Sequence, residues 1–287
     1  MKKKNLTKQI VEASVMIALA TVLSLFKLIE MPYGGSVTLA SMLPILVVSY
    51  RHGIGVGLLS GSVYAVIQQL LGLNNLSYFT TWQSVVAVML LDYIIAFTII
   101  GIGGIVKGRI GLKSLSAPAK QKTELAVGML FVCLLRYGCH TLAGATVWAG
   151  LSIPDSAALI YSISYNATYM LPEAIIAILV SIWIGEVIDF SKNVPVRFPA
   201  SVTAKSEKYA VACEVLPHVS RFLLLFAAAF DTVLTAPHLQ NAETGEFTLA
   251  NLGDVSWIAI GVVSAVAVLA AVVIRIVLSR LTKLRSA

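Results

Sequence analysis

The stretch ELAVGMLFVCLLRYGCHTLAGATV, residues 124–147, decides the class of fold. It is longer than the roughly 20 apolar residues that a helix needs to cross a bilayer. Arg136 and His140 interrupt it, although charged and hydrogen-bonding side chains are costly in hydrocarbon and require a partner there. The stretch therefore predicts a transmembrane helix that carries part of a polar site.

The whole chain has the composition of a membrane protein. It is 58% hydrophobic and 12% charged, against roughly 25% charged residues in a soluble domain, and its mean hydropathy is +0.87. Its 287 residues are enough for about eight membrane spans with short loops. The three cysteines form no CxxC pair and no Cys/His metal spacing, so neither a disulfide framework nor a metal site is expected.

Apolar runs predict eight transmembrane helices. They cover residues 9–29, 36–50, 54–72, 83–106, 124–147, 158–187, 219–236 and 255–279. The second run is short and contains Pro44. The first run follows a basic start, as a signal peptide would, but it continues past Ala20 to Ile29, so we expect a retained helix.

The distribution of charge orients these helices. All Lys and Arg residues except Lys27 and Arg136 fall at the two ends of the chain or in connections on one side of the membrane. The opposite connections hold Glu30, Asp155, Glu243, Glu246 and Asp254. By the positive-inside rule, both termini are expected to be cytoplasmic. The net charge of +7 thus reflects membrane orientation and not nucleic-acid binding.

A change in composition divides the chain. Residues 189–218 are polar, basic and contain prolines, which predicts a cytoplasmic linker between a six-helix unit, 1–188, and an added helical hairpin, 219–287. The expected fold is an all-α integral membrane protein with six plus two transmembrane helices. No internal repeat is evident, which disfavours an inverted-repeat secondary transporter.

Several polar and aromatic residues share one depth in the predicted outer half of the six-helix unit. They are Trp82, Asp92, His140, Trp148, Tyr161 and Asn166. A carboxylate among aromatic faces suits an organic cation, and an imidazole and an amide suit a flat heteroaromatic ring. This set predicts an outward-open cavity for a small, planar, cationic ligand.

Each of these residues also has a purely structural interpretation. Asp92 could pair with Arg136 as an ion pair between helices, and His140 could hydrogen-bond a neighbouring helix. Trp82 and Trp148 could belong to the aromatic belt at the membrane surface. The residues alone leave these alternatives open.

The start of the sixth predicted helix raises a question of spacing. Tyr161, a further candidate for the aromatic belt, and Asn166 are five positions apart, about 140° around an ideal helix, so both face one cavity only if the helix begins irregularly. Asn166 also begins a glycosylation sequon, but the sequon lies within an apolar helix and no glycan is expected.

Four segments carry a family resemblance: PYGGSVTLASMLPI, LLDYIIAF, LLRYGCHTLAGATVW and IYSISYNATYMLP. From about residue 9 to residue 187, the chain resembles the thiamine-specific S component of energy-coupling factor vitamin transporters. The resemblance implies a six-helix protein of the bacterial plasma membrane that captures external thiamine without hydrolysing ATP. Its implied partners are a membrane coupling protein and two cytoplasmic ATPases.

The resemblance also implies site residues. The positions that match ligand contacts of the family are Asp92, followed by Tyr93, and His140, Trp148, Tyr161 and Asn166. Some members carry a tryptophan where this chain has Gly35, and Tyr33 could supply that stacking contact. The segment 189–287 lies outside the family's usual length.

The family couples to its partner through small residues on the first helix. Ser14 and Ala18 form a small-xxx-small pair there, which predicts a partner contact, with internal helix packing as the alternative.

The sequence also leaves functions other than thiamine capture open. The cargo could be a thiamine precursor such as hydroxymethylpyrimidine, or another vitamin. An intramembrane hydrolase using His140 and Asp92 is disfavoured because the chain has no HExxH or GxSxG motif, so no enzyme activity, cofactor or metal is expected. No Walker A sequence occurs, so ATP coupling comes from partners or the chain is a self-sufficient facilitator.

Overall fold

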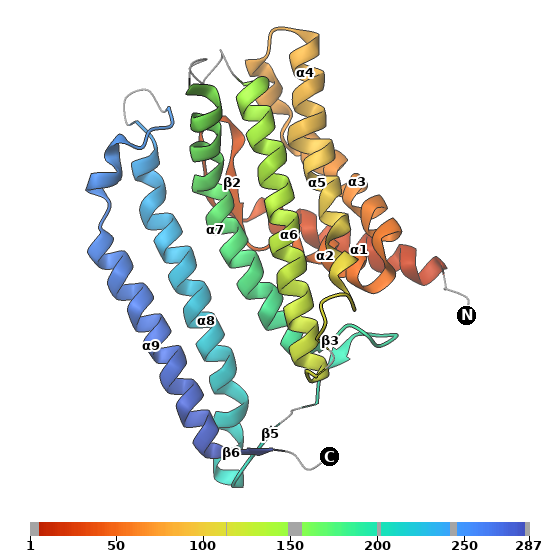
Figure 1. Ribbon diagram of the computed structural model, residues 1–287, viewed down its shortest axis with the longest axis vertical. Coiled ribbons are helices and arrows are strands. Elements are labelled where there is room, and N and C mark those ends of the chain that lie inside the picture. Colours follow the sequence, from red (N-terminus) through yellow and green to blue (C-terminus); the bar gives the residue numbers. More distant parts are fainter. Residues whose placement is uncertain (1–5, 113, 149–156, 200–201, 242–245, 285–287) are drawn as a thin grey trace.

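The structure is a computed structural model that describes residues 6–112, 114–148, 157–199, 202–241 and 246–284, and it is mostly helical (Figure 1). The longer helices are α1 Leu6–Leu25, α2 Leu43–His52, α3 Ile54–Leu71, α6 Ala117–Thr146, α7 Ala158–Val187, α8 Ala210–Thr235 and α9 Trp257–Leu281. Short antiparallel strand pairs join β1 Lys27–Glu30 to β2 Ser36–Thr38, β3 Ile188–Asp189 to β4 Val196–Arg197, and β5 Val202–Ala204 to β6 Thr282–Leu284.

The helix predicted over residues 36–50 is wrong in its first half. Residues Ser36–Thr38 form strand β2, and α2 begins only at Leu43, with Pro44 in the first turn, where the missing N–H would be unpaired in any case. Ten residues rise about 15 Å, too short to cross hydrocarbon roughly 30 Å thick. Eight of the ten are buried, so α2 lies inside the protein. Among the described residues, seven helical segments are long and apolar enough to span a membrane.

The predicted helix 83–106 is one continuous helical rod whose winding changes along its length. It comprises α4 Trp82–Val88, the π-helical η3 Met89–Ile95, α5 Ala96–Thr98 and the 3₁₀-helical η4 Ile99–Val106. Thr81 caps the rod by accepting a hydrogen bond from the Ser84 N–H at 3.3 Å. The wide π turn is the part of the rod that carries Asp92 and Tyr93.

Glycines let η4 pack directly on α3. A Cβ atom at Gly101 would overlap the carbonyl group of Gly57, so the two backbones touch where neither residue has a side chain. Ser49 of α2 joins this contact, because its hydroxyl donates to the Gly101 carbonyl at 2.5 Å and accepts from the Gly104 N–H at 3.0 Å. Small residues at helix contacts are the usual means of close packing in membranes.

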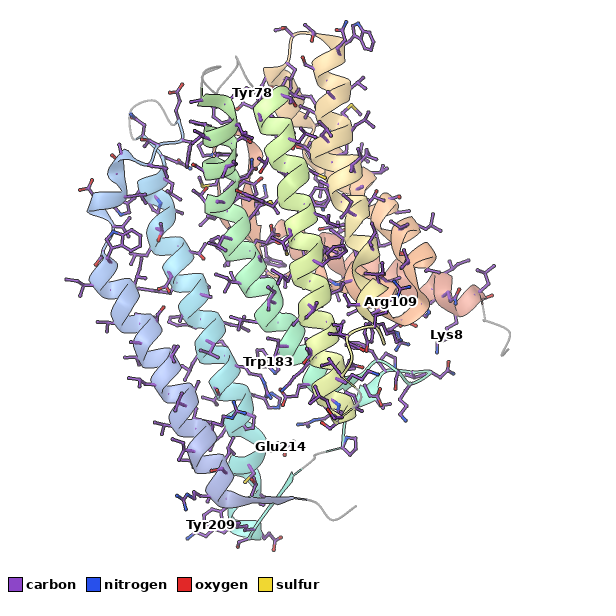
Figure 2. All side chains as sticks on the ribbon, viewed as in Figure 1. Lys8, Tyr78, Arg109, Trp183, Tyr209 and Glu214 are labelled. Carbon is purple, nitrogen blue, oxygen red and sulfur yellow. The ribbon has the colours of Figure 1, made fainter. Side chains whose placement is uncertain are left out.

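Segments expected on the same side of the membrane do meet at one end of the molecule. Lys8 hydrogen-bonds Asn193, and the Arg51 guanidinium pairs with Glu12 and donates to the Phe190 carbonyl at 2.5 Å. Figure 2 shows Lys8 just below mid-height at one edge and Tyr78 near the upper end. Of the charged residues used for orientation, Lys2–Lys4, Lys113, Asp155, Glu243 and Arg285 lie outside the described residues.

The C-terminal pair packs against one side of the bundle. In Figure 1, α6, α7, α8 and α9 lie side by side in that order, and α8 contacts α7. Helix α8 begins at Ala210, earlier than the predicted 219. The connection between α7 and α8 is therefore shorter than the predicted linker, 189–218. Its Arg221 pairs with Glu186 of α7 at 2.8 Å, and His218 accepts a hydrogen bond from Trp183 at 3.0 Å.

Candidate ligand-binding site

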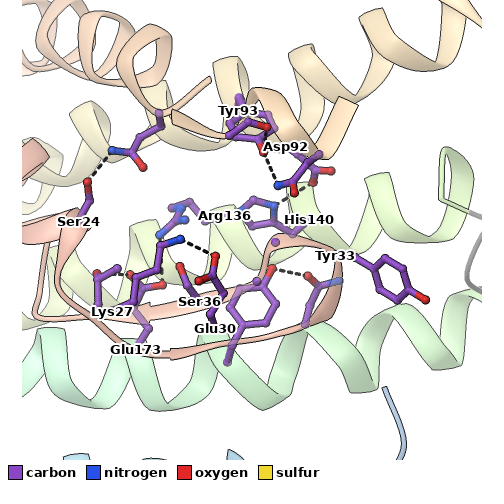
Figure 3. A pocket seen from close by; sticks show the side chains of 18 of the residues that line it. Ser24, Lys27, Glu30, Tyr33, Ser36, Asp92, Tyr93, Arg136, His140 and Glu173 are labelled. Carbon is purple, nitrogen blue, oxygen red and sulfur yellow. Dashed lines mark hydrogen bonds and ion pairs between the residues drawn. The ribbon is translucent and has the colours of Figure 1, made fainter. Parts of the chain in front are cut away.

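A cavity of about 360 Å³ lies between the β1–β2 hairpin, η3, α6 and α7 (Figure 3). It is at the end of the molecule opposite the basic segments. Of the predicted site residues, those that line it are Asp92, Tyr93, His140, Trp148, Tyr161 and Asn166. Five of these residues were predicted from their depth in the membrane, and Tyr93 was predicted from the family resemblance alone.

The π turn of η3 presents Asp92 to α6. The Asp92 carboxylate accepts a hydrogen bond from Trp148 Nε1 at 2.9 Å, and its other oxygen lies 2.9 Å from His140 Nδ1. The side chains of Asp92 and His140 are only 15% and 10% exposed. The carboxylate is thus fixed by two rings, and π turns recur at functional sites for this kind of repositioning.

The imidazole of His140 has capacity left for a ligand. Its Nδ1 faces Asp92, whereas its Nε2 is buried and has no hydrogen-bond partner among the described residues. Buried polar atoms normally have partners, and an exception calls for an explanation such as a missing ligand. The Nε2 atom belongs to a residue that lines the cavity, where a ring nitrogen or amino group could reach it.

Two of the three carboxylates in the described cavity lining have a Lys or Arg partner, and the third does not. Lys27 pairs with Glu30 at 2.6 Å, and Arg136 lies 3.6 Å from Glu173. Asp92 is the remaining carboxylate of the described lining, and it has no Lys or Arg partner. The cavity can therefore accept one positive charge next to Asp92.

The proposed structural pair between Asp92 and Arg136 is wrong. Arg136 instead pairs with Glu173, whose Oε1 also accepts a hydrogen bond from Thr38 at 2.9 Å, and its guanidinium lies 4.5 Å from the Phe97 ring centre. Sequence reasoning missed Glu173 as a cavity residue. The signal was available, because Arg136 and Glu173 are a lone cation and a carboxylate inside two neighbouring spans.

Aromatic rings form much of the remaining wall. Trp148 has its ring centre 4.6 Å from Phe79 and 6.0 Å from Tyr33. Tyr33 lies in the β1–β2 turn, η1 Pro32–Gly34, and lines the cavity. Burial raises the pKa of the Tyr33 hydroxyl, and nearby Glu246 and Tyr78 add to the rise, so the ring stays neutral. Gly35 has no room for a side chain, because a Cβ atom would meet the Tyr169 ring at 2.7 Å.

Residues from a wide face of helix α7 line the cavity. Both Tyr161 and Asn166 line it although α7 is continuous from Ala158, so the expectation of an irregular start is wrong. The long Tyr161 side chain and the width of the cavity compensate for the angle between the two positions. Asn166 is 3% exposed, and its Oδ1 accepts from the Tyr169 hydroxyl at 2.6 Å.

Two further predicted residues have different surroundings. Trp82 is 71% exposed and is not among the residues that line the cavity. Tyr93 lines the cavity, and its hydroxyl accepts from Asn75 Nδ2 at 2.9 Å and donates to the Gly72 carbonyl at 3.3 Å. Asn75, which sequence reasoning did not single out, thus anchors a site residue.

Among the described residues, no group of three or more His, Cys, Asp and Glu side chains could hold a metal ion. The geometry is that of a binding cavity inside a bundle of membrane-capable helices.

Comparison with known proteins identifies this multi-pass membrane protein as a transport protein and not an enzyme. The chain belongs to the family described as "Thiamine transporter protein (Thia_YuaJ)", whose model matches residues 10–189. It is 34% identical over 182 residues to the thiamine transporter ThiT of Bacillus subtilis (strain 168), a match that covers 61% of this chain and 91% of that protein.

A solved structure shares the fold. ThiT from Listeria monocytogenes superposes with a TM-score of 0.51 at 21% sequence identity, and the match covers 64% of this chain and 96% of that one. The family match ends at residue 189, so α8 and α9 lie outside it.

Proposed function

We propose that this chain binds thiamine in the cavity between η3, α6 and α7. It acts there as the substrate-binding S component of an energy-coupling factor transporter. The observation that carries the proposal is the Asp92 carboxylate, which has no Lys or Arg partner in the described lining and is held by His140 and Trp148. The family match and the ThiT relative support the choice of thiamine.

The chemistry of thiamine suits the groups around the cavity. Its thiazolium ring carries a fixed positive charge that can pair with Asp92 and lie against aromatic faces. Its aminopyrimidine offers ring nitrogens and an amino group, which the free Nε2 of His140 can meet. Tyr33, Trp148 and Tyr161 supply apolar ring area around these contacts.

Energy for uptake comes from partner subunits in this proposal. The sequence contains no Walker A motif, so the coupling protein and two cytoplasmic ATPases supply ATP hydrolysis. Ser14 and Ala18 are exposed on α1, whereas Ala13 and Ala20 are buried, which supports a contact with a partner helix through the exposed pair.

The proposed arrangement has a six-helix binding unit, 1–188, a linker, 189–218, and a hairpin, 219–287, with both termini in the cytoplasm. The meeting of Lys8, Arg51 and the segment after α7 at one end supports this orientation. Labelling single cysteines in intact cells tests it, because a cysteine in the 107–116 connection should be protected and one in the 72–81 connection should react.

A binding titration tests the ligand. We expect thiamine to bind the purified chain at least about tenfold more tightly than an analogue whose thiazolium is replaced by an uncharged ring, because only thiamine makes the charge-assisted contact. Hydroxymethylpyrimidine and the thiamine phosphates belong in the same titration. Binding of the pyrimidine as tight as that of thiamine would favour the precursor as cargo.

Reconstitution tests the need for partners. We expect the chain alone in liposomes to accumulate no thiamine, and the addition of the coupling protein, the two ATPases and ATP to produce uptake. Uptake by the chain alone would favour the self-sufficient facilitator.

A further inference from the structure

The connection between α8 and α9 lies at the same end of the molecule as the cavity (Figure 1). Its described residues form η7 Ala236–Leu239, a bridge between Gln240 and Phe247, and η8 Ala250–Asp254. This segment lies outside the part of the chain that matches the family model. We call its described residues, 236–241 and 246–256, the α8–α9 connection.

Phe247 of this connection packs against two tyrosines that line the cavity. Its ring meets Tyr161 edge-on with centres 5.3 Å apart, and it meets Tyr165 in the same way at 5.2 Å. Its carbonyl lies 3.5 Å from the Tyr161 hydroxyl. Phe247 is 6% exposed, so its side chain is enclosed between the connection and the aromatic wall.

The same connection also holds the β1–β2 hairpin. Gln240 Nε2 donates to the Glu30 carbonyl at 3.3 Å. Leu239 is 4% exposed and belongs, with Phe247, to a hydrophobic cluster that includes Met31 and Val37 of the hairpin region. Two walls of the cavity, the start of α7 and the hairpin, are therefore contacted from outside by one segment.

The base of the added pair is fixed as well. Near the middle of α8, Arg221 pairs with Glu186, which also pairs with Lys122 of α6 at 3.4 Å. Trp183 and His218 add a hydrogen bond between α7 and α8. Because α8 is tied to α7 through His218 and Arg221 and the connection itself packs on Tyr161 and Tyr165, the α8–α9 connection has a defined position over the cavity wall.

We propose that the α8–α9 connection braces the ligand cavity and that Phe247 is a positioning residue for it. Phe247 contacts no described group of the Asp92 cluster; it acts by holding Tyr161 and Tyr165 in the orientation that the ligand meets. This inference rests on the proposed function, because it concerns the same cavity and uses thiamine as the ligand.

Thiamine binding by the full-length Phe247→Ala variant tests the brace. Loss of two edge-on ring contacts should weaken binding about fivefold to tenfold, chiefly through faster dissociation. The matched control is Leu249→Ala, which removes an apolar side chain from the same connection at a 42% exposed position and should change affinity less than about twofold. Equal affinities for the two variants would overturn the proposal.

A double variant separates positioning from general stabilisation. If Phe247 acts through the tyrosine wall, Phe247→Ala should weaken binding less in a Tyr161→Ala background than in the native chain, because contacting residues are not additive. Fully additive losses would contradict that route. If Phe247→Ala does not fold, Phe247→Leu takes its place, and affinity equal to that of the native chain would overturn the proposal.

Gln240→Ala tests the hairpin arm separately. It removes one side-chain hydrogen bond to the Glu30 carbonyl and should weaken binding about twofold to fivefold. Thiamine binding by the native chain distinguishes failure of the proposed function from failure of the brace. Failure of the native chain to bind thiamine would refute the proposed function, whereas native binding with an unaffected Phe247→Ala variant would refute the brace alone.

Discussion

Two carboxylates of the cavity lining, the buried Glu173 and the partly buried Asp92, have very different surroundings. Glu173 faces Arg136 and accepts a hydrogen bond from Thr38, so its charge is compensated within the protein. Asp92 has only an indole N–H and an imidazole beside it. Glu173 therefore has a cationic partner within the protein, whereas Asp92 has no Lys or Arg partner among the described residues and can pair with a cationic ligand.

The largest effect in this comparison should come from the compensated carboxylate. Glu173→Leu leaves Arg136 buried without a counter-ion and should lower the free energy of unfolding by about 3–5 kcal/mol. Thermal unfolding of the purified protein in detergent measures this loss. The double variant Arg136→Met/Glu173→Leu is the control and should recover part of the stability. If Glu173→Leu were as stable as the native chain, Glu173 would not be needed to compensate the charge of Arg136.

The uncompensated carboxylate should control affinity instead. Asp92→Asn keeps the size of the side chain but removes its charge, and thiamine binding should weaken by about 1.5–3 kcal/mol. Titration of the purified variant measures the change, and its unfolding temperature should stay close to the native value. Unchanged affinity would remove Asp92 from the site.

A substitution of Trp148 tests how much the hydrogen bond to Asp92 contributes to ligand binding. Trp148→Phe keeps an aromatic ring but removes the Nε1 donor that lies 2.9 Å from the carboxylate. Affinity should fall by about 1 kcal/mol, the usual net value of one hydrogen bond. The same titration in the Asp92→Asn background should show a smaller loss, since the donor then has no charged acceptor to orient.

Trp82 should give the smallest effect. Its side chain is 71% exposed and does not line the cavity, so Trp82→Ala should change thiamine affinity by less than about 0.5 kcal/mol. A loss comparable to that of Trp148→Phe would show that the ligand extends beyond the described lining.

Much of the site could be predicted because membrane depth restricts where polar residues can meet. Asp92 belongs to the fourth predicted span, and His140 and Trp148 belong to the fifth, yet the count of residues from the membrane surface places them together, and they lie within hydrogen-bonding distance. The same reasoning failed for Trp82, because depth fixes the level of a side chain but not the direction in which it points.

The π turn, strand β2 and the position of the C-terminal helices could not be predicted from individual residues. The π turn at Asp92 depends on how the whole rod packs, and apolar periodicity does not distinguish it from an α-helix. The strand at Ser36–Thr38 lies in an apolar run that also suits a helix, so tertiary pairing with β1 decided its conformation. The position of α8 and α9 over α7 followed from side-chain pairing that spacing alone cannot specify.

The contact between Gly57 and Gly101 has a consequence for how a ligand enters. The backbones of α3 and η4 are in direct contact at these two glycines, and Ser49 of α2 is hydrogen-bonded to η4. Sliding of α3 along η4 would therefore make the two backbones clash. We therefore expect ligand entry to leave this helix contact intact and to require movement of other cavity walls, of which the β1–β2 hairpin has no long helix.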